Sequence, residues 1–242
     1  MNIVLLLSKL KRSPKMAGIR KYTNLLYYDP RFVTIKVSNY DIIETDGCKW
    51  YVSDQIPMNQ RVKGNPWFEG IRSTDIVVDI GANIGAITIP LAKVAKKVYA
   101  VEPLFSEELE ANVSLNGLDN VEVIPFGIGA DGWKDIKFDY RCGKSPFITF
   151  GALKRQIGEQ IDFLKMDGEG CEWEMDPSEL KGIRELRLEF HIHRGRIKEC
   201  RRKYEEYVSW MKGEGYKIHI AYINDKLNPY NKEGPEVRAS LK

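Results

Sequence analysis

Short runs of apolar residues alternate with longer amphipathic stretches from residue 75 onward. Such runs predict strands buried on both faces, whereas apolar positions spaced three and four residues apart predict helices. By this pattern we expect strands at 76–80, 98–102, 121–126, 136–140, 163–167 and 186–190. Helices are expected at 84–95, 106–116, 149–157 and 197–211. This alternation is typical of an α/β fold, a doubly wound and mostly parallel sheet with helices on both faces.

Both ends of the chain depart from this alternation. The apolar runs at 216–223 and 237–241 have no helix between them, which predicts an antiparallel pair. Before residue 71 the chain is rich in aromatic residues, and strands are expected at 33–37 and on either side of a turn within 42–52. We therefore expect a small N-terminal α+β appendage at 1–70 and a main domain at 71–242. The appendage is expected to pack over one edge of the sheet, to line the binding site, or both.

Composition narrows the class of protein only a little. The chain of 242 residues is 43% apolar and carries a net charge of +3, which suits one large domain with a substantial core. Cys48, Cys142, Cys171 and Cys200 are far apart and predict reduced thiols. The apolar run at 3–7 is shorter than a signal-peptide core, and no stretch approaches the roughly 18 apolar residues of a membrane span. We expect a short amphipathic helix there, and a cytoplasmic protein without a membrane span.

One strand-turn-helix segment carries the strongest chemical signal. The first strand runs into Asp79-Ile-Gly81-Ala-Asn83-Ile-Gly85, and the next strand ends at Glu102, 21 residues after Gly81. An acid at this spacing can reach ribose hydroxyls bound over the first turn. The turn lacks the third glycine of a dinucleotide fingerprint, and a carboxylate at 79 suits a cationic amino group better than a pyrophosphate. S-adenosylmethionine has an ammonium, a sulfonium and a ribose diol, so these five residues predict a site for this methyl donor.

Further acidic side chains are expected at the same edge of the sheet. Asp167 and Glu169 follow one strand, and Glu189 and His191 end the next strand on a shared face. Ligands bind beyond the carboxyl ends of parallel strands, so we expect these four residues to line the acceptor side. One of them would take the proton of a hydroxyl acceptor, without a metal.

Two other interpretations of these residues stay open. Asp167, Glu189 and His191 could form a divalent-metal site that orients a diol. His191 could equally be a histidine whose hydrogen bonds are satisfied within the end of the sheet.

Five blocks in this order resemble the FkbM family of S-adenosylmethionine-dependent methyltransferases. They are D-x-G-x-N-x-G, V-x-x-V-E-P, L-x-x-N-V-x-L-N, K-x-D-x-E-G-x-E and E-x-H, at 79–85, 98–103, 109–116, 165–172 and 189–191. The resemblance covers about residues 70–195, and the fourth block is its most family-specific part. It implies a seven-stranded Rossmann-like methyltransferase sheet and transfer of a methyl group to a hydroxyl oxygen. Gly168 and Cys171 stand where the family usually has Val and Ala.

Three functions are consistent with this pattern. We take O-methylation of a hydroxyl on a sugar or other small molecule as the expectation. The alternative is methylation of RNA, including tRNA, with phosphate contacts from a basic segment: Arg194, Arg196, Lys198, Arg201, Arg202 and Lys203. Intervening glutamates favour an ordinary solvated helix face, and the sequence has no N-P-P-Y or D-P-P-Y loop. A non-catalytic nucleotide-binding module is the third possibility, which the complete donor motif disfavours.

Overall fold

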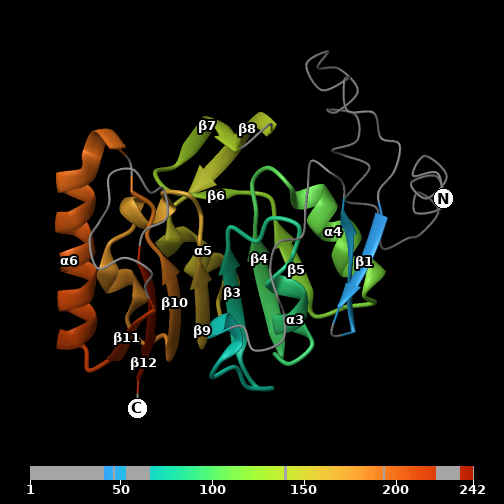
Figure 1. Ribbon diagram of the computed structural model, residues 1–242, viewed down its shortest axis with the longest axis horizontal. Coiled ribbons are helices and arrows are strands. Elements are labelled where there is room, and N and C mark those ends of the chain that lie inside the picture. Colours follow the sequence, from blue (N-terminus) through green and yellow to red (C-terminus); the bar gives the residue numbers. More distant parts are fainter. Residues whose placement is uncertain are drawn as a thin grey trace.

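The computed structural model describes residues 41–45, 47–52, 66–138, 141–192, 194–221 and 235–241. Its central seven-stranded sheet has the order β11-β12-β10-β9-β3-β4-β5 (Figure 1). The strands are β3 (Ile76–Ile80), β4 (Lys97–Val101), β5 (Val121–Ile124), β9 (Phe163–Met166), β10 (Glu185–Glu189), β11 (Lys217–Ala221) and β12 (Glu236–Ser240). β12 is antiparallel to β10 and β11, and the remaining neighbours pair in parallel. The expected mostly parallel sheet and its late antiparallel pair are confirmed.

Helices cover both faces of this sheet because successive side chains of each strand point to opposite sides. Val78 of β3 shares a buried cluster with Leu153 of α5 (Phe150–Ile157) and Tyr207 of α6 (Ile197–Gly213). Val77, its neighbour in the chain, packs instead in the cluster of Leu91 from α3 (Thr88–Ala92). On that second face, α4 (Ser106–Leu115) packs against β4. The layers therefore leave the carboxyl ends of the parallel strands as the edge at which ligands can approach.

The first helix is shorter than the sequence predicts. A helix was expected over 84–95, but α3 spans only Thr88–Ala92. The backbone has positive φ at Gly81, Asn83 and Gly85, and no residue of an α-helix has that conformation. The glycine turn therefore extends further along the chain than the apolar periodicity suggests, and the helix starts only after it.

A second, three-stranded sheet of order β6-β8-β7 stands beside the central one. It consists of β6 (Gly127–Ile128), β7 (Gly132–Phe138) and β8 (Arg141–Ile148), of which the sequence predicted only a strand at 136–140. Arg141, Gly143 and Lys144 interrupt the apolar pattern of β8, so its strand character is hidden. The antiparallel pair of β7 and β8, here called the β7/β8 ribbon, is tied to the segment after β4. Ser145 Oγ donates to the Pro103 carbonyl at 2.7 Å, and Arg141 donates to the Leu104 carbonyl at 2.9 Å.

The described part of the appendage holds a short 3-10 helix, η3 (Pro66–Phe68), and a hairpin of β1 (Asp41–Thr45) and β2 (Cys48–Val52), which confirms the turn expected within 42–52. It lies beside α4, at the end of the sheet opposite α6 (Figure 1). Asn112 of α4 and Asn116, which follows its last residue, accept hydrogen bonds from the backbone of β2. Trp50 is fully buried, and its Nε1 donates to the Gly85 carbonyl at 3.2 Å. The hairpin thus packs over one edge of the domain and supports the glycine turn.

Some expectations fall outside the described residues, namely the N-terminal amphipathic helix and the strand at 33–37. Among the residues that the structure does describe, no helix is long and apolar enough to cross a membrane. All four cysteines are free thiols, as expected.

Candidate functional site

The turn after β3 holds a left-handed backbone at three positions. Gly81, Asn83 and Gly85 have φ of 73°, 49° and 90°. Asparagine is one of the few residues other than glycine that adopt this region readily. The amides of Gly81 and Ala82 both donate to the Val101 carbonyl, at 2.9 and 3.2 Å, which fixes the turn over the end of β4. The structure therefore brings the predicted glycine turn to the carboxyl ends of β3 and β4.

Asp79 lies beneath this turn and is fully buried. Its Oδ2 accepts a hydrogen bond from Thr88 Oγ1 at 2.6 Å, and its Oδ1 lies 3.1 Å from the Lys165 ammonium. Lys165 also donates to the Gly81 carbonyl at 2.8 Å. Burial alone would lower the pKa of Lys165, but the charges of Asp79 and Asp167 outweigh it and raise this pKa. Asp79 and Lys165 thus hold the turn from below, and direct contact between Asp79 and a donor's ammonium stays a prediction.

Glu102 reaches from the end of β4 into the same turn and is buried. Its Oε2 accepts from the Asn83 amide at 2.8 Å, and its Oε1 accepts from the Leu104 and Phe105 amides at 2.7 and 3.1 Å. Burial raises the pKa of Glu102, and these three amides oppose that rise. A carboxylate offers about four acceptor sites, so about one remains for a ligand hydroxyl. The sequence predicted that Glu102 would accept both ribose hydroxyls, and the geometry narrows this to one.

Replacing Glu102 with glutamine is expected to weaken binding of S-adenosylhomocysteine, the demethylated donor, by roughly 10- to 100-fold. The amide would turn a donor toward the backbone N–H groups, and lost charge-assisted hydrogen bonds cost about 1.5–3 kcal/mol. Isothermal calorimetry measures the change. Glu122→Gln on the neighbouring strand β5 is the control, because Glu122 is exposed and pairs with Lys97. Equal affinity in the two variants would remove Glu102 from the donor site.

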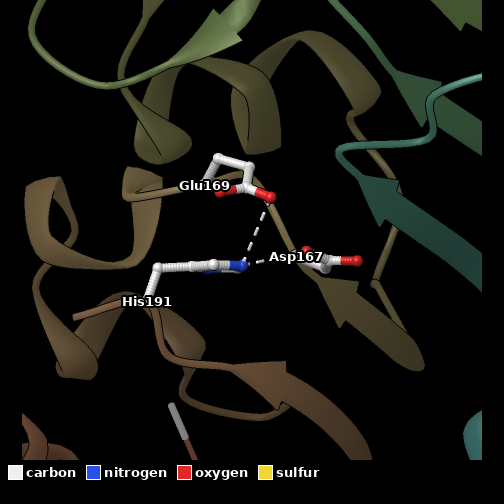
Figure 2. Close-up of side chains that lie close together, drawn as sticks. All are labelled: Asp167, Glu169 and His191. Atoms are coloured by element: carbon white, nitrogen blue, oxygen red, sulfur yellow. Dashed lines mark ion pairs between the residues drawn. The ribbon is translucent and has the colours of Figure 1, made fainter. Parts of the chain in front are cut away.

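The predicted acid cluster also forms, around the imidazole of His191 (Figure 2). His191 Nε2 lies 3.5 Å from Asp167 Oδ1, 3.7 Å from Glu169 Oε1 and 3.8 Å from Glu189 Oε1. The histidine is 6% exposed, whereas the Glu169 side chain is 51% exposed and marks the open side of the cluster. The four residues predicted to line the acceptor side are therefore neighbours in the structure.

The charges of this cluster shift the proton affinities of its members. Burial lowers the pKa of His191, but Glu172 and the surrounding carboxylates outweigh it and raise this pKa to about 9. Burial, reinforced by Asp167, raises the pKa of Glu189 to about 8. Protons therefore compensate part of the negative charge of this cluster.

Two residues of the site were not singled out from the sequence. Glu172, in η4 (Cys171–Glu174), is fully buried, and its Oε1 lies 3.2 Å from His191 Nδ1 and accepts from the His191 amide at 2.6 Å. Trp173 Nε1 donates to the His191 carbonyl at 2.6 Å. Glu172 is the last acid of K-x-D-x-E-G-x-E, and its fixed place in that block was the available signal. No sequence pattern indicated the hydrogen bond of Trp173.

The glycine turn and the acid cluster around His191 are adjacent. The Asp167 amide donates to the Ile80 carbonyl at 3.1 Å, directly before the glycine turn. Asp167 Oδ2 also lies 3.7 Å from the Lys165 ammonium, which in turn contacts Asp79. Asp167 thus faces both halves of the site.

The basic segment at 194–203 belongs to η6 (Arg194–Arg196) and the start of α6. Arg196 pairs with Glu199 at 2.6 Å and Arg202 pairs with Glu206. Lys203 donates to the Trp173 carbonyl. Two of the six basic residues are therefore paired with acids and a third with a carbonyl, which fits a solvated helix face of mixed charge.

Comparison with known proteins agrees with this architecture. The chain superimposes on an rRNA methylase from Streptococcus thermophilus with a TM-score of 0.50 and 16% identity, covering 73% of this chain and 92% of the other. The chain has a methyltransferase-like fold. At this identity the likeness shows the fold and does not identify a substrate.

Sequence relatives match shorter segments, and no family model matches. The chain is 39% identical over 91 residues to a probable ribosomal RNA small subunit methyltransferase A of Methanosphaera stadtmanae, covering 36% of this chain and 32% of the relative. It is also 39% identical over 64 residues to an uncharacterized RNA methyltransferase of Oceanobacillus iheyensis, covering 26% and 13%. The chain thus aligns with about a third or less of each relative's length. The FkbM resemblance stays a prediction, because no family model tests it.

Proposed function

We propose that this protein is an S-adenosylmethionine-dependent methyltransferase. The observation that carries the proposal is the contact between two half-sites, the glycine turn with Glu102 and the cluster around His191, through Asp167. In methyl transfer an acceptor atom attacks the methyl carbon, the carbon–sulfur bond breaks, and the electron pair stays on sulfur. The enzyme's main contribution is to align donor and acceptor, and adjacent half-sites supply that alignment. The methyltransferase-like fold and the names of the relatives support this assignment.

The acceptor class that the comparisons favour is RNA, which revises the expectation of a small hydroxylated molecule. Both relatives described above are named as RNA methyltransferases. The basic segment at 194–203 gives limited support for RNA binding, because acids interrupt it and pair with Arg196 and Arg202. A different surface, the β7/β8 ribbon, fits this partner better.

The ribbon presents an aromatic side chain and lysines to solvent. Trp133 is 66% exposed, and it lies opposite Pro146 in the strand register. Lys137 and Lys144 are exposed on the same side of the ribbon, together with one acid, Asp135, which lies opposite Lys144. An exposed aromatic ring with nearby cations is the combination that stacks a nucleobase and holds its phosphate. Ser145 and Arg141 anchor the other face of the ribbon to the segment after β4, so the ribbon stands at the edge of the sheet that bears the site (Figure 1).

A hydroxylated small molecule is the second candidate, and the acid cluster favours it. Asp167, Glu169 and Glu189 make the acceptor side negative, which repels phosphate groups and suits a neutral polyol. A carboxylate or imidazole at this place can take the proton of a hydroxyl. The same groups could take the proton of a ribose hydroxyl in RNA. The two candidate acceptors therefore differ in the rest of the molecule that carries the hydroxyl, with phosphates in RNA and none in a neutral polyol.

Labelling with a deuterated methyl donor tests the acceptor class. We expect label in the nucleosides of digested total RNA, and none in a nuclease-treated small-molecule extract. Trp133→Ala is expected to weaken RNA binding by about 5- to 150-fold, since stacking contributes roughly 1–3 kcal/mol per base. Val94→Ala, which changes another exposed apolar side chain near the amino ends of the strands, should leave binding unchanged. Label in small molecules but not in RNA would establish the second candidate instead.

A further inference from the structure

The carboxylates around His191 Nε2 point toward one common space. One oxygen from Asp167, one from Glu169 and the imidazole nitrogen all lie within 4.8 Å of one another, and Glu189 Oε1 is 3.8 Å from that nitrogen. We propose that Asp167, Glu169, Glu189 and His191 bind one divalent metal ion. This assignment reverses the expectation, drawn from the sequence, of a metal-free acceptor side.

The first argument is the orientation of His191. A carboxylate only accepts hydrogen bonds, so Glu172 Oε1, 3.2 Å from Nδ1, fixes the ring proton on Nδ1. Nε2, the nitrogen that would bind a metal in exchange for its proton, is therefore directed into the cluster (Figure 2). A buried carboxylate that holds the outer nitrogen of a histidine is the usual support of a metal-binding imidazole. Glu172 is fully buried, so its role lies in holding His191 and not in contacting a ligand from solvent.

The second argument is distance. Ligand atoms about 2.1–2.2 Å from one ion, at angles between tetrahedral and trigonal, stand about 3.4–3.8 Å apart. The three contacts of Nε2 are 3.5, 3.7 and 3.8 Å. They are longer than the 2.7–3.2 Å typical of hydrogen bonds with a nitrogen donor. Within the described residues no hydrogen bond to Nε2 reaches that range, although the side chain is nine-tenths buried.

The third argument is charge. Three carboxylates gathered at one place need compensating protons or a cation. Lys165 faces the other oxygen, Oδ2, of Asp167 at 3.7 Å, and it is occupied chiefly by Asp79. A proton on Nε2 can neutralise one charge, and a divalent ion replaces that proton while neutralising two. The exposed side of Glu169 gives an ion a path from solvent.

One nitrogen and up to three carboxylate oxygens suit Mn²⁺, Fe²⁺ or Zn²⁺ better than Ca²⁺. The role of such an ion rests on the proposed methyltransferase function. It would hold an acceptor oxygen beside the donor turn, and it would favour loss of that oxygen's proton to solvent or a nearby carboxylate. Binding of the metal itself does not depend on that role.

The test measures metal binding to the full chain, with Mn²⁺ alone and no donor or acceptor. Calorimetry and the loss of the free Mn²⁺ paramagnetic signal should both report one site per chain. Glu169→Gln changes an exposed side chain, so the fold should persist while affinity falls at least 10-fold. Asp167→Asn and His191→Gln should abolish binding. Glu174→Gln, which removes one exposed acid from the same η4 turn outside the cluster, should bind like the unmodified protein.

Two results would overturn the proposal. One is an absence of stoichiometric Mn²⁺ and Zn²⁺ binding, which would assign the compensating charge to protonated His191. The other is equal binding in Glu169→Gln, Asp167→Asn and the Glu174 control, which would place the ion elsewhere. Because S-adenosylhomocysteine binding is measured separately, failure of the metal site leaves the methyltransferase proposal standing.

Discussion

Replacing Gly81 with alanine is expected to destabilise the folded protein by about 3–5 kcal/mol, the sum of backbone strain and overpacking. A Cβ at this position would stand 1.8 Å from the Asp167 carbonyl oxygen. That oxygen belongs to the backbone of the neighbouring strand end, so it cannot move aside as a flexible side chain would. The residue also has φ of 73°, which side chains rarely tolerate. Chemical denaturation followed by circular dichroism measures the loss.

Gly117→Ala separates the two causes. Gly117 follows α4 with φ of 66°, and a Cβ there would meet nothing within 4 Å. Its replacement carries the backbone strain without the clash, so we expect a cost of only about 1–2 kcal/mol. If both variants lost the same stability, the close approach of Asp167 to the glycine turn would be wrong.

Asp167→Asn is expected to reduce methyl transfer at least ~100-fold while donor affinity stays within a few fold. General acid–base groups typically contribute about 10²–10⁴ in rate. Asp167 faces His191 on the acceptor side, whereas the donor turn is held by Glu102 and Lys165. Single-turnover rates of methyl transfer to the acceptor that the labelling experiment identifies measure the first effect. Calorimetry of donor binding measures the second.

The control for this variant is Asp119→Asn, an exposed acid between α4 and β5. It should leave both transfer and donor affinity unchanged. A parallel loss of transfer and donor binding in Asp167→Asn would move Asp167 into the donor pocket. Unchanged transfer would remove it from the reaction.

The sequence predicted the central sheet well because each of its strands is marked by a local run of apolar residues. Mostly apolar runs such as 76–80 and 163–166 are buried on both faces, so burial and periodicity agree. The β7/β8 ribbon was only half predicted, because one side of it faces solvent and lysines stand where a buried strand would be apolar. The start of α3 was misplaced because positive φ at Asn83 is a property of the folded turn, which periodicity does not report.

In the candidate site, too, the sequence predicted the features that depend on local spacing and missed those that depend on contacts between distant segments. Spacing along the chain found Glu102, His191 and the three acids around its Nε2, since strand ends of a parallel sheet converge at one edge. It could not show that Glu102 is largely satisfied by the Asn83, Leu104 and Phe105 amides. It also could not show that Gly81 is required by the carbonyl of Asp167. Both facts depend on contacts between segments far apart in sequence.

The central claim is that the glycine turn and Glu102 bind a methyl donor, and calorimetric titration of the unmodified protein with S-adenosylhomocysteine tests it most directly. The account predicts saturable binding at one site per chain, with S-adenosylmethionine competing for it. NAD should not compete, because the turn lacks the third glycine of a dinucleotide site and carries the buried acid Asp79 beneath it. Absence of binding, or equal displacement by NAD, would contradict the account.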